Sequence, residues 1–189
     1  MIERVAEPYP PGFFDKFTTE ESDRACAVLA GALLDSLLER LLRKVMVPNS
    51  SRELFRAQGP LGSFAAKIDL ALALGLISHE DHGELTLVRR IRNDFAHHLD
   101  HNLNFTTAHI ADRVRALQLP RIITEYNHRL QKSFAEEYVQ AVRESLRRRF
   151  EIAIAFLTAH VNDRIKDVTA PKAPEPVVAK LDRSADASA

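Results

Sequence analysis

The chain of 189 residues is poor in cysteine and has no excess of charge of either sign. Its single cysteine, Cys26, excludes a disulfide within the chain, and its position on the apolar side of a predicted helix indicates a buried thiol. Lys and Arg together number 26, as do Asp and Glu, so the formal net charge is zero. Non-specific binding of duplex nucleic acid depends on a basic excess that neutralises phosphates. The composition therefore argues against a dedicated DNA-binding domain, while leaving room for a local basic patch.

Long hydrophobic runs and strand patterns are also missing from the sequence. No apolar stretch approaches the roughly 20 residues of a membrane span. The first residues carry Glu3 and Glu7 in place of the apolar run of a signal peptide. We therefore expect a cytoplasmic protein that does not contact a membrane. The sequence also has no dinucleotide-binding fingerprint, no phosphate-binding loop spacing and no Ser-His-Asp or Cys-His arrangement, so these classes of enzyme are excluded.

Apolar residues recur at three- and four-residue steps along most of the chain, which predicts amphipathic helices. Thr18 and Glu21 have the spacing of a capping box at the start of the first helix, which we expect to end before Pro48. A second helix is predicted over Gly62–Leu76. The apolar stripe of the first helix comprises Cys26, Leu29, Leu33, Leu37, Leu41 and Val45, and that of the second comprises Phe64, Ile68, Leu72 and Leu76.

A third helix is predicted after Ser78-His79-Glu80-Asp81, a segment typical of an N-terminal cap. A loop over Asn102–Thr106 and a shorter helix over Thr107–Leu117 follow. The apolar side chains expected on the third helix are Leu85, Val88, Ile91, Phe95 and, near its end, Leu99.

The longest periodic stretch runs from about Ser133 to about Asp167 without a proline or glycine. Its length predicts packing either against a partner subunit, in a homodimer, or along a whole helical bundle. We expect an all-α bundle of about five to six helices over residues 18–168. Residues 1–17 form an irregular leader in this interpretation. Residues 169–189, rich in Ala, Pro, Ser and charge, form a disordered tail.

One segment with candidate catalytic residues is Arg92-Asn93-Asp94-Phe95-Ala96-His97. It resembles the signature of the HEPN superfamily, helical domains of which many are metal-independent ribonucleases. The resemblance implies that the arginine and the histidine of two subunits meet across a dimer interface. His97 would transfer a proton at the ribose hydroxyl or the leaving oxygen, Arg92 would hold the scissile phosphate, and Asn93 would support the pair.

The spacing within this segment also permits a structural interpretation. Five residues of a continuous α-helix advance about 7.5 Å and turn about 140°. Arg92 and His97 would therefore share a face only if the helix ended near Ala96 or if a second subunit completed the pair. Alternatively, Arg92 and Asn93 hold the following loop through hydrogen bonds.

A wider pattern includes this segment. Gly59-Pro60-Leu61-Gly62, Leu74-Gly75-Leu76-Ile77 and the segment from Arg92 to His97 follow one another in the order and approximate spacing of the mannitol operon repressor (MltR-like) family, which the chain resembles from Gly59 to about Phe105. The resemblance implies an all-helical transcriptional regulator of a sugar-alcohol operon that lacks a recognised DNA-reading element and acts through a protein partner.

Three functions are therefore kept in view. We favour a non-enzymatic regulator of the mannitol operon repressor type that acts through protein contacts. The alternative is a HEPN-type metal-independent ribonuclease with RNA as its ligand, and the third is a helical interaction module unrelated to sugar metabolism. A helix-turn-helix corner at Leu74–Ser78 is unconvincing as a DNA reader, because Glu80 and Asp81 would face phosphates.

Two further clusters contain polar side chains. His97, His98, Asp100 and His101 include histidines at the i and i+4 spacing of a helical metal site. Because no cysteine or H-E-x-x-H motif accompanies them, we expect a solvated cluster with no metal or cofactor. The second cluster is basic, lies next to glutamates, and indicates a solvated face with ion pairs such as Glu144–Arg148; a phosphate-binding patch is the alternative. Its members are Arg143, Arg147, Arg148 and Arg149.

Overall fold

The computed structural model describes residues 22–47, 52–100, 102–118 and 144–172. These ranges contain five helices and no strand, so the all-α prediction is confirmed. No helix within the described ranges is long and apolar enough to cross a membrane. The helices are α2 (Asp23–Lys44), α3 (Phe64–Ala73), α4 (His79–His97), α5 (Ala108–Ala116) and α8 (Leu146–Asp167).

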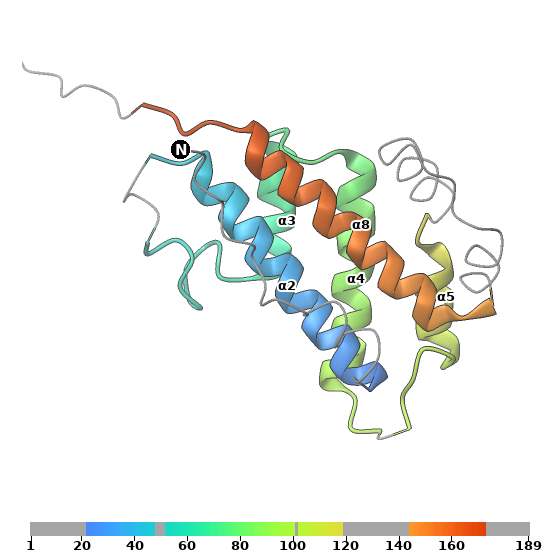
Figure 1. The fold of residues 1–189 in the computed structure, drawn as a ribbon. Coiled ribbons are helices and arrows are strands. Elements are labelled where there is room, and N and C mark those ends of the chain that lie inside the picture. The colour runs from blue at the N-terminus through green and yellow to red at the C-terminus, as the bar shows by residue number, and fades with distance from the viewer. Residues whose placement is uncertain (1–21, 48–51, 101, 119–143, 173–189) are drawn as a thin grey trace, which may run out of the picture.

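Helix α2 is the central element, since it packs against α3, α4 and α8 (Figure 1). It runs parallel to α8: Asp23 at its start pairs with Arg147, and Lys44 at its end donates a hydrogen bond to the carbonyl of Ile165. It runs antiparallel to α4, because Arg24 reaches the last turn of that helix. Helix α5 packs against both α4 and α8.

The predicted apolar stripes form the core. In the first stripe every residue is buried except Leu29 and Val45, which are half-buried, and Cys26 is a buried free thiol as expected. The loop between α4 and α5 adds Phe105, only 1% exposed, to this core. Its ring lies 5.2 Å from that of Phe95 and 4.9 Å from that of Phe150, so three segments distant in sequence meet at one aromatic contact.

Serine is the N-cap residue of four of the five described helices. Ser22, Ser63, Ser78 and Ser145 each accept a hydrogen bond from the backbone N–H three residues later. Such caps satisfy N–H groups that have no partner within the helix. Ser22, not Thr18, caps α2, and Thr18 lies outside the described residues.

Glycine ends α3 three residues earlier than predicted. Gly75 has a φ of 67°. Its N–H donates to Leu72, and that of Leu76 donates to Ala71, which together form a Schellman motif. The helix therefore ends at Ala73, while Leu76 is still buried.

Two expectations about helix length are wrong. Helix α4 ends at His97, and Leu99 beyond it is 91% exposed, so this leucine does not extend the buried stripe. A continuous helix from Ser133 to Asp167 is also wrong, because Ser145 has an extended backbone and caps a helix that begins at Leu146. Residues 133–143 lie outside the described ranges.

The shorter α8 changes the basis of the dimer prediction. Its buried stripe packs against α2 and α5 of the same chain, so burial of this stripe needs no second subunit. A homodimer therefore stays a prediction. So does the disordered tail: residues 168–172 follow α8 without helical structure, and residues 1–17 and 173–189 lie outside the described ranges.

Candidate functional site at the end of helix α4

Arg92 and Asn93 lie side by side in the second half of α4. The Arg92 Nη1 atom donates a hydrogen bond of 2.8 Å to Asn93 Oδ1, and both residues are half-buried. The aliphatic part of Arg92 lies directly on Gly31 of α2, where a Cβ atom would stand 2.7 Å from Arg92 Cγ. The hydrogen bond between Arg92 and Asn93 fits the supporting role expected for Asn93. It fits a structural role of both residues equally well.

His97 is exposed and is the last residue of α4. The helix ends close to Ala96, as one of the two conditions required, but His97 itself is still helical. The two residues stay about 140° apart around the helix axis. Among the described residues, His97 forms no side-chain hydrogen bond or ion pair with another group. Within the part of the chain that the structure describes, no hydrogen bond or ion pair joins Arg92 to His97, and a catalytic role of the two residues stays a prediction.

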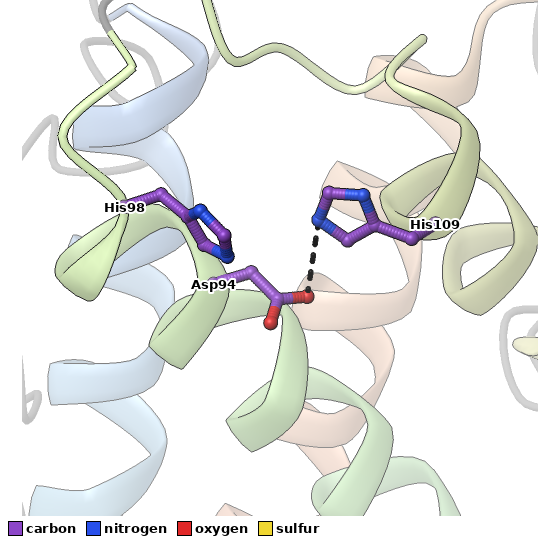
Figure 2. Close-up of side chains that lie close together, drawn as sticks. All are labelled: Asp94, His98 and His109. Atoms are coloured by element: carbon purple, nitrogen blue, oxygen red, sulfur yellow. Dashed lines mark ion pairs between the residues drawn. The ribbon is translucent and has the colours of Figure 1, made fainter.

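The structure instead gathers Asp94, His98 and His109 in one place (Figure 2). Asp94 and His98 are one turn apart at the end of α4, and His109 faces them from the first turn of α5. The His109 Nε2 atom lies 3.9 Å from Asp94 Oδ2, and the two imidazole rings have centroids 5.7 Å apart. Arg113, one turn further along α5, forms a close ion pair with the same Asp94 oxygen.

This arrangement replaces the predicted histidine cluster. Only His98 of that cluster takes part in the new group. Asp100 accepts a hydrogen bond from the backbone N–H of Asn102 instead, and His101 lies outside the described residues. Sequence reasoning missed Asp94, His109 and Arg113. The available signal was the i, i+4 spacing of Asp94 with His98 and of His109 with Arg113, which places each pair on one helix face.

Arg24 holds the same end of α4 from the opposite side. Its guanidinium donates to the carbonyl oxygens of Phe95, His98 and Asp100 at 2.7, 3.0 and 2.7 Å. These carbonyls come at or after the last helical turn, where few intrahelical donors remain. A cation at a helix C-terminus also interacts favourably with the helix dipole. Nothing in the local sequence of α4 indicates this contact.

The predicted basic cluster on α8 is engaged by other parts of the chain. Arg147 bridges Asp23 of α2 and the buried Glu151, at 2.9 and 2.8 Å. Burial opposes the charged form of Arg147, but these acceptors raise its pKa overall. Arg149 donates to three carbonyls at the end of α5, and burial lowers its pKa. Arg148 pairs with Glu151, while Arg143 lies outside the described residues.

Helix α4, which follows the helix-turn-helix-like corner, lies within the bundle. Its neighbours are α2, α3 and α5, and its residues Leu85, Val88 and Ile91 are fully buried. Of the two acids expected to face phosphates, Glu80 is exposed, whereas Asp81 is buried in the capping box of the helix. The apolar face of this helix is used by the core, and the exposed Glu80 in its first turn would repel phosphates.

Comparison with known proteins decides the family. A family model described as "Mannitol repressor" matches residues 19–169, most of the chain. The chain belongs to the mannitol repressor family. The predicted family resemblance is thereby confirmed, and with it the assignment to regulators of the mannitol operon repressor type.

The mannitol repressor fold is also found among solved structures. A chain of the X-ray structure titled "X-ray structure of the MtlR-HPr complex from Escherichia coli" superposes with a TM-score of 0.58 at 17% sequence identity. The match covers 78% of this chain and 94% of that chain, which confirms the fold. No curated protein matches the sequence.

The segment that resembles the mannitol repressor family has a largely structural role. Leu61, Leu76 and Ile77 belong to the buried core. Gly75 forms the Schellman motif at the end of α3, and Ser78 begins α4. Most residues that carry the resemblance from Gly59 to Phe105 therefore form helix ends or pack in the core. The polar residues near the end of α4 are the part of this segment that could take part in binding or catalysis.

Proposed function

We propose that this mannitol repressor family member regulates transcription by contacting another protein and not by reading DNA. The observation that carries the proposal is the match to the mannitol repressor family over residues 19–169, together with the fold shared with an Escherichia coli protein whose structure title describes a complex with another protein. The exposed Glu80 in the first turn of α4 and the zero formal net charge support it, because both disfavour contact with phosphates. The cytoplasmic location expected from the sequence is part of the same proposal.

The partner we propose is an HPr-type protein. The support is the Escherichia coli structure with this fold, whose title describes a complex of MtlR with HPr. An interaction of this kind would let the regulator respond to a second protein without a DNA-binding element of its own.

The experiment is a titration of the purified full-length chain with HPr from the same organism, followed by isothermal titration calorimetry. We expect saturable binding that persists at about 0.15 M salt, where exposed charges are largely screened. Parallel gel-shift assays with the promoter of a sugar-alcohol operon should show no more binding than an unrelated duplex. Sequence-specific DNA binding without HPr binding would overturn the proposal.

Phe150→Asp provides a control for the folded state. Phe150 is fully buried, and an unpaired carboxylate there should unfold the bundle. HPr binding should disappear in this variant together with the helical circular dichroism signal. Binding that survives unfolding would show that a disordered segment, and not the bundle surface, makes the contact.

The alternative is a HEPN-type ribonuclease, for which the Arg92–Asn93 hydrogen bond and the exposed His97 are the supporting observations. It requires a homodimer, because one chain leaves Arg92 and His97 on different faces of α4. RNA cleavage in EDTA that is lost in both Arg92→Ala and His97→Ala would establish it. Absence of cleavage by the folded protein, or a monomeric mass at tens of micromolar, would remove it.

A further inference from the structure

We propose that Asp94, His98 and His109 form a binding site for a divalent transition-metal ion of the Zn²⁺ type. Among the described residues, this is the group of histidine and carboxylate side chains whose potential ligand atoms, one from each residue, all lie within 4.8 Å of one another. The proposal is independent of the HPr interaction and concerns a different property of the protein.

The geometry is close to that of an occupied site. Zinc binds imidazole nitrogen and carboxylate oxygen at about 2.0–2.2 Å, so two ligand atoms of a tetrahedral site are separated by roughly 3.3 Å. His109 Nε2 and Asp94 Oδ2 are 3.9 Å apart, which a small rotation of an exposed ring can close. His98 and His109 are both exposed, and the three side chains converge on one space between α4 and α5 (Figure 2).

The ligand chemistry selects the class of ion. Two imidazoles with one carboxylate suit Zn²⁺ and its neighbours Co²⁺, Ni²⁺ and Cu²⁺. Mg²⁺ and Ca²⁺ prefer a shell made of oxygen atoms, and the site offers a single carboxylate. Three protein ligands leave the fourth position of a tetrahedral ion to water.

Arg113 should influence how tightly the proposed site binds a metal ion. It already pairs with Asp94, and its positive charge competes with a cation for that carboxylate. Both His109 and Arg113 approach Asp94 Oδ2, so a metal bound to that oxygen requires the arginine to move to Oδ1, where it can still hold the carboxylate by an outer hydrogen bond. The charge of Arg113 should therefore weaken metal binding without preventing it.

The site lies where a metal would have a structural effect. Asp94 and His98 lie at the end of α4 and His109 lies in the first turn of α5, so an ion would join the two helices directly. Binding to the folded state alone raises stability in proportion to the logarithm of ligand excess over Kd. Zinc should thus raise the melting temperature of the full-length chain.

The test uses the metal-free full-length protein, titrated with ZnCl₂ in a calorimeter and with CoCl₂ in an absorption spectrometer. We expect one saturable site and the visible bands of four- or five-coordinate Co²⁺. His98→Ala and His109→Ala should each weaken binding by at least about tenfold, since loss of even an outer-shell partner typically costs about 10–100-fold. Asp94→Asn should weaken it as well, and Arg113→Gln should tighten it.

Two histidines serve as matched controls. His82 pairs with Asp69 at 2.9 Å on another part of the surface, and His97 is the neighbour of His98 that lies outside the proposed site. His82→Ala and His97→Ala should leave the affinity and the Co²⁺ spectrum unchanged. The proposal is overturned if no micromolar binding is found, or if the His98 and His109 variants, shown to be folded by circular dichroism, bind as the parent does. Loss of binding in His97→Ala alone would also overturn it, because the histidine run would then be the site.

Discussion

The two ends of helix α4 are stabilised in different ways. At the N-terminal end the partners are local: the Ser78 side chain accepts from the Asp81 backbone, and the Asp81 carboxylate accepts from the backbone of Ser78. At the C-terminal end the partners are distant, since Arg24 reaches carbonyls that lie 71 to 76 residues later in the chain. One end is thus specified by four consecutive residues, and the other exists only once α2 and α4 have packed.

The two ends of α4 also differ in the side chains that surround them. The N-terminal end is closed by its own capping box and by His160, whose Nδ1 lies 3.2 Å from Asp81. The C-terminal end places Asp94, His98 and His109 at a surface open to solvent. The end that depends on tertiary contacts is therefore also the end at which two histidines and a carboxylate from two helices meet.

The largest effect should come from the aromatic contact beneath the C-terminal end. Phe105→Ala removes a ring packed between Phe95 and Phe150, and we expect a loss of about 3–5 kcal/mol in the free energy of unfolding. Urea unfolding followed by circular dichroism measures it, since the chain has no tryptophan. Leu99→Ala, in the same loop but 91% exposed, should change stability by less than about 0.5 kcal/mol. Similar losses in both variants would contradict the observed packing of this loop.

Arg24→Met should have the next largest effect. It removes three charge-assisted hydrogen bonds to the end of α4 while keeping an aliphatic chain, and we expect a loss of about 2 kcal/mol. Amide hydrogen exchange should speed up first in the last turn of α4. Arg56→Met removes an exposed ion pair with Glu53 and should cost about 0.5 kcal/mol or less. An effect of Arg24→Met no greater than this control would show that the distant cap is not important.

Ser78→Ala should have a smaller effect at the N-terminal end. It removes the side-chain acceptor of the capping box, which typically costs about 1 kcal/mol. Ser78→Gly is the matched variant, because glycine is tolerated at this position and should cost only a few tenths of a kcal/mol. A loss above that of Arg24→Met would reverse the comparison between the two ends.

The Glu39–Lys67 pair, away from both ends of α4, should respond to acid. Burial opposes ionisation of Glu39, but hydrogen bonds from Lys67 and Arg43 lower its pKa below the ordinary value of 4.5. A carboxylate with a lowered folded pKa stabilises the protein above its unfolded pKa, and this contribution is lost as the pH falls through the folded pKa. The stability difference between the parent and Glu39→Gln should therefore be constant near pH 7 and shrink below about pH 4.5. A difference that does not change with pH would contradict the lowered pKa.

The features that the sequence predicted are those encoded locally. The apolar stripes, the Ser78 cap and the short helix before Leu117 follow from spacing within a few residues, and the structure contains them. Helix α3 ends earlier than predicted because the Schellman motif at Gly75 terminates the helix, although the apolar pattern continues to Leu76. The break at Ser145 was missed because a serine is compatible with a helix interior as well as with a cap.

The candidate site was predicted only in part, because its residues meet through tertiary packing. His98 was noticed within a histidine-rich run, but His109 comes from another helix and Asp94 was treated as part of the Arg92–His97 segment. Their proximity depends on how α5 packs against α4, which periodicity within either helix does not specify. The family resemblance succeeded for a different reason, since it compares several separated elements at once.

The contact between Gly31 and Arg92 restricts which residues can occupy these two positions in related proteins. A Cβ atom at position 31 would lie 2.7 Å from Arg92 Cγ and 3.2 Å from its Cβ, so α2 and α4 keep their spacing only while position 31 has no side chain. The two positions should therefore vary together among relatives. Where an arginine is retained at position 92, glycine should be retained at position 31, and a larger residue at 31 should be accompanied by a shorter one at 92.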